Sequence, residues 1–213
     1  MFKGIKEIQH FVGETFDARL KGFDITELPD DKNHLNKWLV DKEKSELEAF
    51  KSEEKANQRR ATLALIGKEL GVLGSIARDE HGKPRIINSN QEISISHCKN
   101  LIAYAIAPRP IGVDIHHYTP KTQVVAKKFL LEQEIDFCEK HTEQPFLDLF
   151  WGVKEAVFKV YGRNLPFKEI QIDLENIQSN QLTCNVNSRR GVIDVSFALH
   201  KHFSICLAEL RNS

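Results

Sequence analysis

Residues 101–116 read LIAYAIAPRPIGVDIH, and this stretch divides the chain into two parts. Its first seven residues are apolar enough to form a central strand, and its last six have the alternation of a second strand. Pro108 and Pro110 interrupt the pattern between them, because proline cannot donate a hydrogen bond to a sheet. We therefore predict two halves, residues 1–107 and 108–213, joined at this pair of prolines.

Each half combines strand and helix patterns. In the first half, residues 5–25 predict two strands with a turn near Gly13, and residues 41–73 predict one helix without proline. In the second half, two helical segments, residues 121–140 and 145–162, precede three alternating runs typical of antiparallel strands. The expected fold is α+β, with two similar subdomains in a pseudo-twofold arrangement, each an antiparallel sheet packed with helices.

The composition excludes a large electrostatic field. The 213 residues include 30 Lys and Arg against 30 Asp and Glu, so nothing attracts nucleic acid or anionic lipid globally. We expect neither as a partner. An anionic ligand must instead be held by a local cluster of cations.

Membrane insertion and secretion are not expected either. The sequence has no run of about 18 apolar residues, and its start, MFKGIKEIQHF, is too short and too charged for a signal peptide. The cysteines are widely scattered and form no CxxC pair, which indicates free thiols in a reducing compartment. They are Cys98, Cys138, Cys184 and Cys206. We predict a cytoplasmic protein.

The strand IGVDIH carries a carboxylate in an apolar context. With a period of two, Val113 and Ile115 face the core, while Gly112, Asp114 and His116 share the other face. A buried charge is costly unless a metal ion, a cation or N–H donors compensate it. The alternative is an Asp at a strand end that bonds a neighbouring turn.

A second charged group lies on the helix predicted at residues 145–162, within the stretch LFWGVKEAVFKVYG at residues 149–162. Trp151, Glu155 and Lys159 follow one another at intervals of four and form one stripe, with Lys154 beside it. Glu155 and Lys159 could simply be a surface ion pair. However, an exposed helix face seldom begins with tryptophan, which favours a functional role for these charged residues within a binding or active site.

Two further patterns could bind an anion. His97 is expected just past a buried strand, in a turn where the hydroxyl of Ser96 and free backbone N–H groups could hold a phosphate or position a base. An inert histidine in a turn is the alternative. Cations also step along one side of the first predicted helix, where they could equally form a solvated face. They are Lys51, Lys55, Arg59 and Arg60.

The order of these motifs resembles the 4′-phosphopantetheinyl transferase superfamily, and especially its larger, two-half branch, which activates surfactin synthetase and similar systems. The matching pieces span residues 82–162; outside this range the likeness is one of pattern only. They are Gly82-Lys83-Pro84, Ser94-Ile95-Ser96-His97, Gly112-Val113-Asp114-Ile115, and WGVKEAVFK from Trp151 to Lys159.

The resemblance implies an activity and its partners. Members of this family transfer the 4′-phosphopantetheine arm of coenzyme A to a serine of an acyl or peptidyl carrier protein, and release adenosine 3′,5′-bisphosphate. The reaction depends on magnesium. The active site is then expected at the interface of the two halves. Since one chain carries both half-sites, the resemblance also implies a monomer.

It also implies residue roles. Asp114 and Glu155 would be magnesium ligands, and Glu155 would act as the general base, directly or through water. Lys159 and Lys154 would neutralise phosphate charge, with Lys159 nearer the bond that breaks. The remaining contacts with the nucleotide and phosphates of coenzyme A would come from Lys83, Pro84, Ser96 and His97. The cations of the first predicted helix are candidates for binding its 3′-phosphate. They are Lys51, Lys55, Arg59 and Arg60.

One position departs from the family pattern GxDIE, because His116 stands where the last carboxylate is usual. The residue at this position would be the third metal ligand, and a neutral imidazole binds magnesium less well than a carboxylate does. Three explanations are open: water takes the third ligand position, the protein prefers manganese, or catalysis has been lost. A coenzyme A-binding relative without turnover is therefore one rival hypothesis. The other is a transition-metal enzyme whose metal is held by His97, Asp114, His116 and Glu155.

Overall fold

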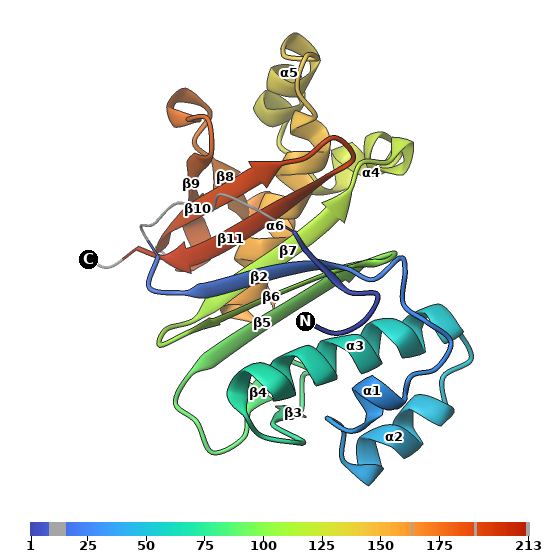
Figure 1. Ribbon diagram of the computed structural model, residues 1–213. Coiled ribbons are helices and arrows are strands. Elements are labelled where there is room, and N and C mark those ends of the chain that lie inside the picture. The colour runs from blue at the N-terminus through green and yellow to red at the C-terminus, as the bar shows by residue number, and fades with distance from the viewer. Residues whose placement is uncertain (9–15, 163, 190, 212–213) are drawn as a thin grey trace.

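The computed structural model describes residues 1–8, 16–162, 164–189 and 191–211. The chain folds into two antiparallel sheets, each packed with helices, and the N-terminal half lies below the C-terminal half in Figure 1. This confirms the predicted α+β class. The turn predicted near Gly13 lies outside the described residues, and the pseudo-twofold relation between the halves stays a prediction.

The N-terminal sheet has four strands in the spatial order β1-β2-β6-β5, and all neighbours are antiparallel. Its strands are β1 (Lys6–Ile8), β2 (Arg19–Asp24), β5 (Glu92–Cys98) and β6 (Leu101–Ala107). A short hairpin of β3 (Ile76–Arg78) and β4 (Pro84–Ile86) stands apart from this sheet. All strands of this half end before the proline pair.

The helices of this half differ from the single helix predicted at residues 41–73. The structure has α1 (Asn33–Asn36), α2 (Asp41–Glu48) and α3 (Glu53–Leu70). The prediction was wrong because Ser52 caps a new helix, its Oγ accepting the N–H of Lys55 at 3.4 Å. Gly71, with φ +68°, ends α3 in the left-handed conformation that glycine adopts without strain.

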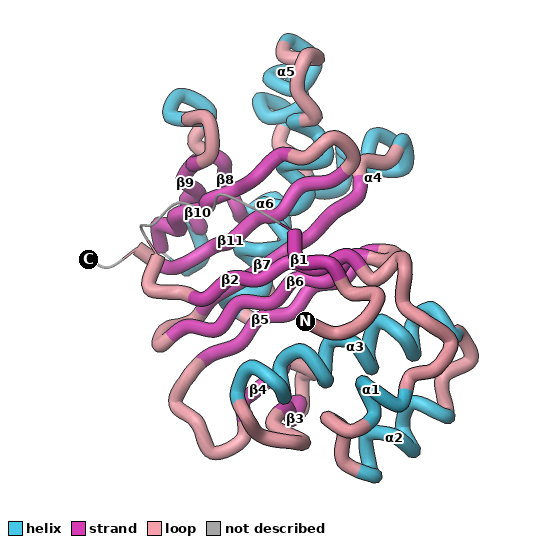
Figure 2. The backbone as a smooth tube through the Cα atoms, in the orientation of Figure 1, coloured by secondary structure: helices cyan, strands magenta, loops and turns pink. Residues whose placement is uncertain are grey.

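The C-terminal sheet has five antiparallel strands in the order β7-β11-β10-β9-β8. They are β7 (Ile111–His117), β8 (Ile170–Ile172), β9 (Gln181–Val186), β10 (Gly191–Leu199) and β11 (Phe203–Leu210). The helices are α4 (Pro120–Phe129), α5 (Glu132–Lys140) and α6 (Phe146–Tyr161), with short 3-10 turns at Phe167–Glu169, Leu174–Asn176 and Asn187–Arg189. Figure 2 shows α6 running behind this sheet.

Strand β6 explains why LIAYAIA is apolar throughout. Its even-numbered residues, such as Ile102 and Tyr104, belong to a core shared with α3. Its odd-numbered residues, such as Leu101 and Ala103, belong to a second core shared with β7 and β11. Since both faces are buried, neither can carry polar residues. The second core holds the two sheets together.

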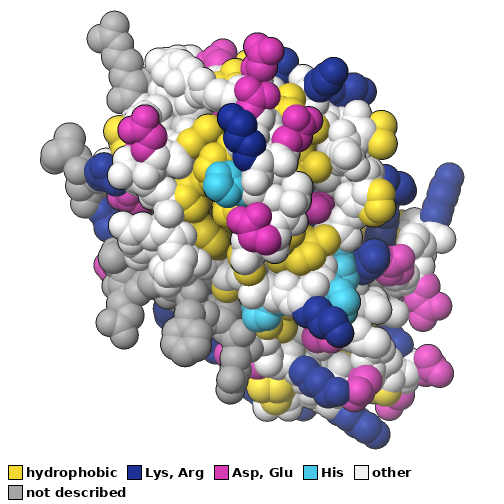
Figure 3. Space-filling view, turned by 90° about the horizontal axis from the view of Figure 1, so that it is seen from above, with side chains coloured by type: hydrophobic (Ala, Val, Ile, Leu, Met, Phe, Trp, Pro, Cys, Tyr) yellow, Lys and Arg dark blue, Asp and Glu magenta, His cyan; other side chains and the backbone are white. Residues whose placement is uncertain are grey.

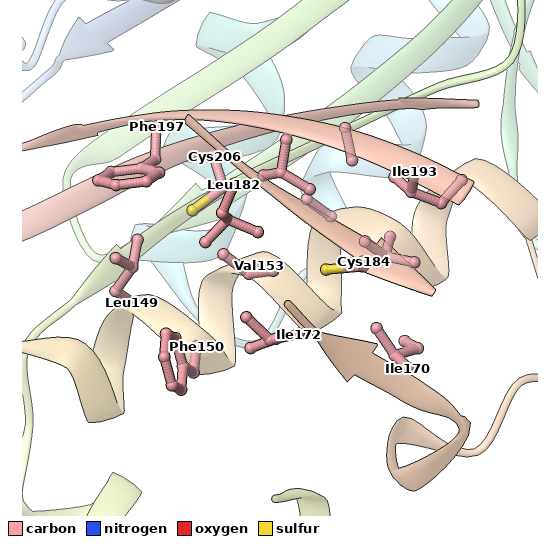
Figure 4. Packing of buried hydrophobic residues seen from close by; sticks show 14 of the residues in the cluster. Leu149, Phe150, Val153, Ile170, Ile172, Leu182, Cys184, Ile193, Phe197 and Cys206 are labelled. Carbon is pink, nitrogen blue, oxygen red and sulfur yellow. The ribbon is translucent and has the colours of Figure 1, made fainter. Parts of the chain in front are cut away.

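Helix α6 is the main support of the C-terminal sheet. Leu149 and Val153 project from it toward Leu182 and Phe197 of the strands, as Figure 4 shows. Its apolar residues recur at helical spacing and fill one continuous core. The orientation of this helix therefore decides which of its charged residues reach solvent.

Lys154 lies on the face of α6 that is turned away from solvent. Its Nζ donates to Glu134 Oε2 at 2.6 Å and to the carbonyl oxygen of Ile170 at 2.8 Å, with those of Phe129 and Phe167 at 3.1 and 3.2 Å. Both charged side chains are 0% exposed. The prediction that Lys154 contacts a phosphate is wrong, because its ammonium is sealed among protein oxygens.

The pair joins three elements of the C-terminal half. Glu134 of α5 also accepts the N–H groups of Leu131 at 2.9 Å and Ile172 at 3.0 Å. Burial lowers the pKa of Lys154, and the charge of Glu134 opposes that change. Each charge is therefore stable in the interior only while the other is present.

Replacing Lys154 with Met should lower the free energy of unfolding by about 3–5 kcal/mol, because Glu134 is left buried without a cation. The double variant Lys154→Met/Glu134→Gln should recover part of this loss. Lys128→Met, at an exposed position of α4, is the matched control and should change stability by about 0.5 kcal/mol or less. Urea unfolding measures all three. Equal stabilities of the two single variants would contradict a structural role for Lys154.

Candidate active site

Two glycines allow α6 to lie directly on β7. A Cβ at Gly112 would stand 1.9 Å from the carbonyl oxygen of Ala156, so no other residue fits at this point of the strand. A Cβ at Gly152 would stand 3.5 Å from Asp114 Oδ2 and 3.2 Å from Cys206 Sγ. Helix and strand are thus in backbone contact, and the charged side chains beside this contact must meet.

Asp114 is 6% exposed and has two strong partners. Its Oδ1 accepts hydrogen bonds from Lys159 Nζ at 2.8 Å and from Ser96 Oγ at 2.7 Å. Lys159 also donates to the carbonyl oxygen of Val113 at 2.9 Å. The predicted alternation of β7 is confirmed, since Val113 lies in the core between the sheets and Asp114 faces α6. A cation and a hydroxyl compensate the buried charge.

Glu155 lies one helical turn before Lys159 and is half-buried. It makes no hydrogen bond or ion pair with the residues that the structure describes. Burial raises the pKa of Glu155, and the charge of Asp114 raises it further, while Lys159 and His116 lower it. Two carboxylates thus share a site with one lysine, which leaves negative charge unbalanced. This donor set suits a divalent cation that prefers oxygen ligands.

His116 is held by a carboxylate that the sequence did not point to. Its Nε2 lies 3.0 Å from Asp148 Oδ1, which also accepts the hydroxyl of Thr122 at 2.6 Å and the N–H of Thr119 at 3.1 Å. Among the described residues, no group of three His, Cys, Asp or Glu side chains is placed to hold a metal. The prediction that His116 is a metal ligand beside Asp114 and Glu155 stays a prediction.

The serines of the SISH motif connect the two halves. Ser94 Oγ accepts the N–H of Val113 at 2.9 Å, and Ser96 donates to Asp114, as described above. Both serines are buried, and they come from β5, which belongs to the other sheet. The structure therefore gives Ser96 a role in orienting Asp114. The predicted contact of Ser96 with coenzyme A stays a prediction.

His97 lies inside β5 rather than in the predicted turn, and cations surround it. Partial burial lowers the pKa of His97, and the charges of Lys159, Arg78 and Arg59 lower it further. These groups come from α6, β3 and α3, so they form a region of positive potential that no single element contains. Arg78 was not predicted. Its guanidinium donates to the carbonyl oxygen of Gly82 at 2.6 Å, in the glycine-lysine-proline turn.

The other predicted cations do not all join this region. Arg60 turns toward α1, with its guanidinium 3.1 Å from Asn36 Oδ1 and 2.9 Å from Asn57 Oδ1. Lys51 precedes α3 and is exposed. Lys55 is also exposed, one turn before Arg59 on the same helix. The structure thus brings Arg59 to the cations and leaves Arg60 out.

Lys83 and Pro84 lie where the two halves meet. Gly82, with φ +82°, makes the turn that places them. A Cβ at Gly162, at the C-terminal end of α6, would stand 3.3 Å from Lys83 Cδ, while Lys83 Nζ lies 3.3 Å from Glu92 Oε2. The turn of the N-terminal half therefore reaches the end of the helix that carries Glu155.

The surface agrees with a local rather than a global charge pattern. On the face drawn in Figure 3, Lys and Arg side chains are interspersed with Asp and Glu. Within the described ranges, no helix is long and apolar enough to cross a membrane.

Comparison with known proteins adds an independent line of evidence. The family model of the 4′-phosphopantetheinyl transferase superfamily matches residues 110–208. A 4′-phosphopantetheinyl transferase of Bacillus subtilis is 33% identical over 109 residues, which are 48% of each chain. The 4′-phosphopantetheinyl transferase gsp of Aneurinibacillus migulanus is 25% identical over 107 residues, 48% of this chain and 45% of the relative.

A smaller relative aligns differently. The holo-acyl-carrier-protein synthase of Mycoplasma mobile is 28% identical over 94 residues, which are 43% of this chain but 88% of the relative. This chain spans about half the length of the two larger relatives in these matches. The family match includes Asp114, Glu155 and Lys159, the three residues that the contact of α6 with β7 brings together. Residues 110–208 of this chain are therefore similar to the 4′-phosphopantetheinyl transferase superfamily.

Proposed function

We propose that this protein transfers 4′-phosphopantetheine from coenzyme A to a serine of an acyl or peptidyl carrier protein, with magnesium, releasing adenosine 3′,5′-bisphosphate. The observation that carries the proposal is the meeting of Asp114, Glu155 and Lys159 between β7 and α6. Residues of the N-terminal half that reach the C-terminal half, such as Ser96 and Lys83, support a site at the interface of the halves. The division at residues 107 and 108 is part of this proposal.

The carboxylates of Asp114 and Glu155 fit a magnesium ion. Glu155 has no hydrogen-bond or ion-pair partner among the described residues, and burial together with the nearby charge of Asp114 raises its pKa. Magnesium is commonly held by one or two carboxylates together with phosphate oxygens and water. When bound, it would neutralise negative charge on the pyrophosphate of coenzyme A. Because Asp148 holds His116, we propose that water rather than imidazole completes the ligand set.

The side chains would divide the chemistry among them. Glu155 would accept the proton of the carrier serine as the serine oxygen bonds to the phosphorus that bears the pantetheine arm. The bond from that phosphorus to the oxygen shared with the nucleotide would then break. Lys159 would stabilise the charge that develops on the departing adenosine 3′,5′-bisphosphate. A raised pKa favours Glu155 as the base, since efficient proton transfer needs a pKa near the working pH.

The cations around His97 would bind the 3′-phosphate of coenzyme A. Arg59 and Arg78 both act on His97, together with Lys159, so their charges converge on one region. A guanidinium matches phosphate geometry with two parallel hydrogen bonds. We therefore assign the 3′-phosphate to Arg59, Arg78 and His97, and exclude Arg60, whose guanidinium is occupied by Asn36 and Asn57.

Helix α4 would receive the carrier protein. Val124 is 84% exposed on this helix, and Lys121, Lys127 and Lys128 lie exposed beside it. Carrier proteins present a helical, usually acidic surface, which this combination complements. Thr122 of the same helix donates to Asp148, the partner of His116, so the surface adjoins the site. We also propose action as a monomer in the cytoplasm, where free thiols persist.

The rival hypotheses fare differently. A transition-metal site of His97, Asp114, His116 and Glu155 lacks support, because the described residues contain no group of three suitable ligands. A protein that binds coenzyme A without turnover would keep the same side chains as an active transferase, so the two have the same geometry. A measurement of turnover separates it from an active transferase.

Intact mass spectrometry of a panel of apo carrier proteins, mixed with the protein, coenzyme A and magnesium, tests the activity. At least one carrier should gain the mass of the phosphopantetheine arm. Glu155→Gln should slow the transfer by about 100-fold or more, because the proton acceptor is lost. Glu53→Gln, an exposed position of α3, is the isosteric control and should react normally. Coenzyme A binding without transfer to any carrier would favour the inactive relative.

Magnesium should stabilise the wild-type protein but not Glu155→Gln. Without metal, the variant should be the more stable of the two, because it lacks a half-buried charge beside Asp114. Thermal unfolding with EDTA or magnesium chloride measures both effects, and Glu53→Gln should retain the full magnesium shift. If Glu155→Gln gained as much stability from magnesium as the wild type, Glu155 would not be a ligand.

Arg78→Ala and Arg59→Ala should each raise the KM for coenzyme A by about 10-fold to 100-fold, as expected for loss of a charged hydrogen bond. Neither change should affect the KM for 3′-dephospho-coenzyme A, which lacks the phosphate they bind. Arg60→Ala should leave both values unchanged. An equal effect of Arg78→Ala on the two substrates would reject the assigned contact.

A further inference from the structure

A polar cavity lies on the opposite side of the C-terminal sheet from the site described above. In β10, Ile193 and Val195 pack toward α6, so Asp194 and Ser196 point to the other face. In β11, Cys206 belongs to the α6 core, and Glu209 points to the other face. Asp194, Ser196 and Glu209 line this cavity of about 490 Å³, a volume within the range of small-molecule sites.

The floor of the cavity carries carboxylates side by side. Asp194 and Glu209 are direct cross-strand neighbours, a placement that costs stability when both are charged. Arg211 binds Asp194 through both oxygens, at 3.0 and 3.1 Å from its Nε, and Arg109 lies 2.8 Å from Glu209. Among the described residues, Asp173, which also lines the cavity, accepts hydrogen bonds from neutral donors such as the N–H of Glu175 and the amide of Asn176.

The charges of the wall therefore do not cancel. Asp173, Asp194 and Glu209 face two arginines, which leaves one negative charge in excess among the lining residues. Burial raises the pKa of Glu209, Arg109 opposes this, and the charges of Asp17 and Asp194 raise it further. A phosphate or carboxylate ligand is disfavoured here, and a cation is favoured.

Ser196 supplies a second, independent observation. Its side chain is 0% exposed, and its Oγ has no hydrogen-bond partner in the part of the chain that the structure describes. Leaving a buried hydroxyl unpaired costs about 1–3 kcal/mol, so a partner is expected on the cavity side. Gln181 and Leu207 are its cross-strand neighbours, and the row that contains Asp194 and Glu209 lies beside it.

We propose that this cavity binds a small molecule that carries a primary ammonium group and a hydroxyl group. The ammonium would donate to Asp194 and Glu209, whose oxygens accept from more than one donor. The hydroxyl would pair with Ser196. Phe16, which also lines the cavity, would cover the aliphatic part of the ligand. The sheet separates this site from Asp114, so its occupation does not depend on the proposed transferase activity.

Isothermal titration of the full chain with three compounds of one length tests this. They share a terminal hydroxyl and differ at the other end: 4-amino-1-butanol, 1,4-butanediol and 4-hydroxybutyrate. The amine should bind at least about 10-fold more tightly than the diol, and the carboxylate should not bind. Asp194→Asn should weaken amine binding by about 10-fold, and Ser196→Ala by a few-fold. Glu155→Gln should bind the amine as the wild type does.

Each result decides the proposal. Ser196→Ala should also raise the melting temperature without ligand, because it removes an unpaired hydroxyl, so the variant remains folded for the comparison. Equal binding of the three compounds, or no binding of the amine, would overturn the proposal. So would amine binding that is unchanged in Asp194→Asn and Ser196→Ala. Loss of binding in Glu155→Gln would place the ligand in the other site and would also overturn it.

Discussion

The contact of α6 with β7 is the constraint on which the site depends. Gly112 lets the helix approach until the carbonyl oxygen of Ala156 occupies the space of a Cβ. At that separation, Lys159 on the helix donates a hydrogen bond to Asp114 on the strand. Glu155 lies near enough for both of their charges to act on it. Neither element carries the chemistry alone. The site is a property of the packing, and any residue larger than glycine would separate its parts.

Two lysines of one helix have opposite roles because they lie on different faces. Lys154 is enclosed with Glu134 and fixes α6 to α5 and β8. Lys159 is partly exposed and compensates the buried charge of Asp114. The first pair holds the helix in its rotation, and that rotation presents Glu155 beside Asp114. The unbalanced charge of the second group is what a divalent cation would neutralise.

Much of this arrangement could be predicted from periodicity. The alternation of IGVDIH places Asp114 opposite the core, and the spacing of four aligns Glu155 with Lys159. Periodicity could not assign Lys154 or His116, because their partners, Glu134 and Asp148, are 20 and 32 residues away in sequence. Arg78 was missed for the same reason. Its relation to His97 exists only after three elements have packed together.

The most direct measurement of the central claim is anomalous diffraction from crystals grown with coenzyme A and manganese in place of magnesium. The account predicts one anomalous peak within coordination distance of the carboxylates of Asp114 and Glu155, with His116 still bonded to Asp148. A peak centred on His116 and Asp148, or a metal bound by only one of the two carboxylates, would contradict it.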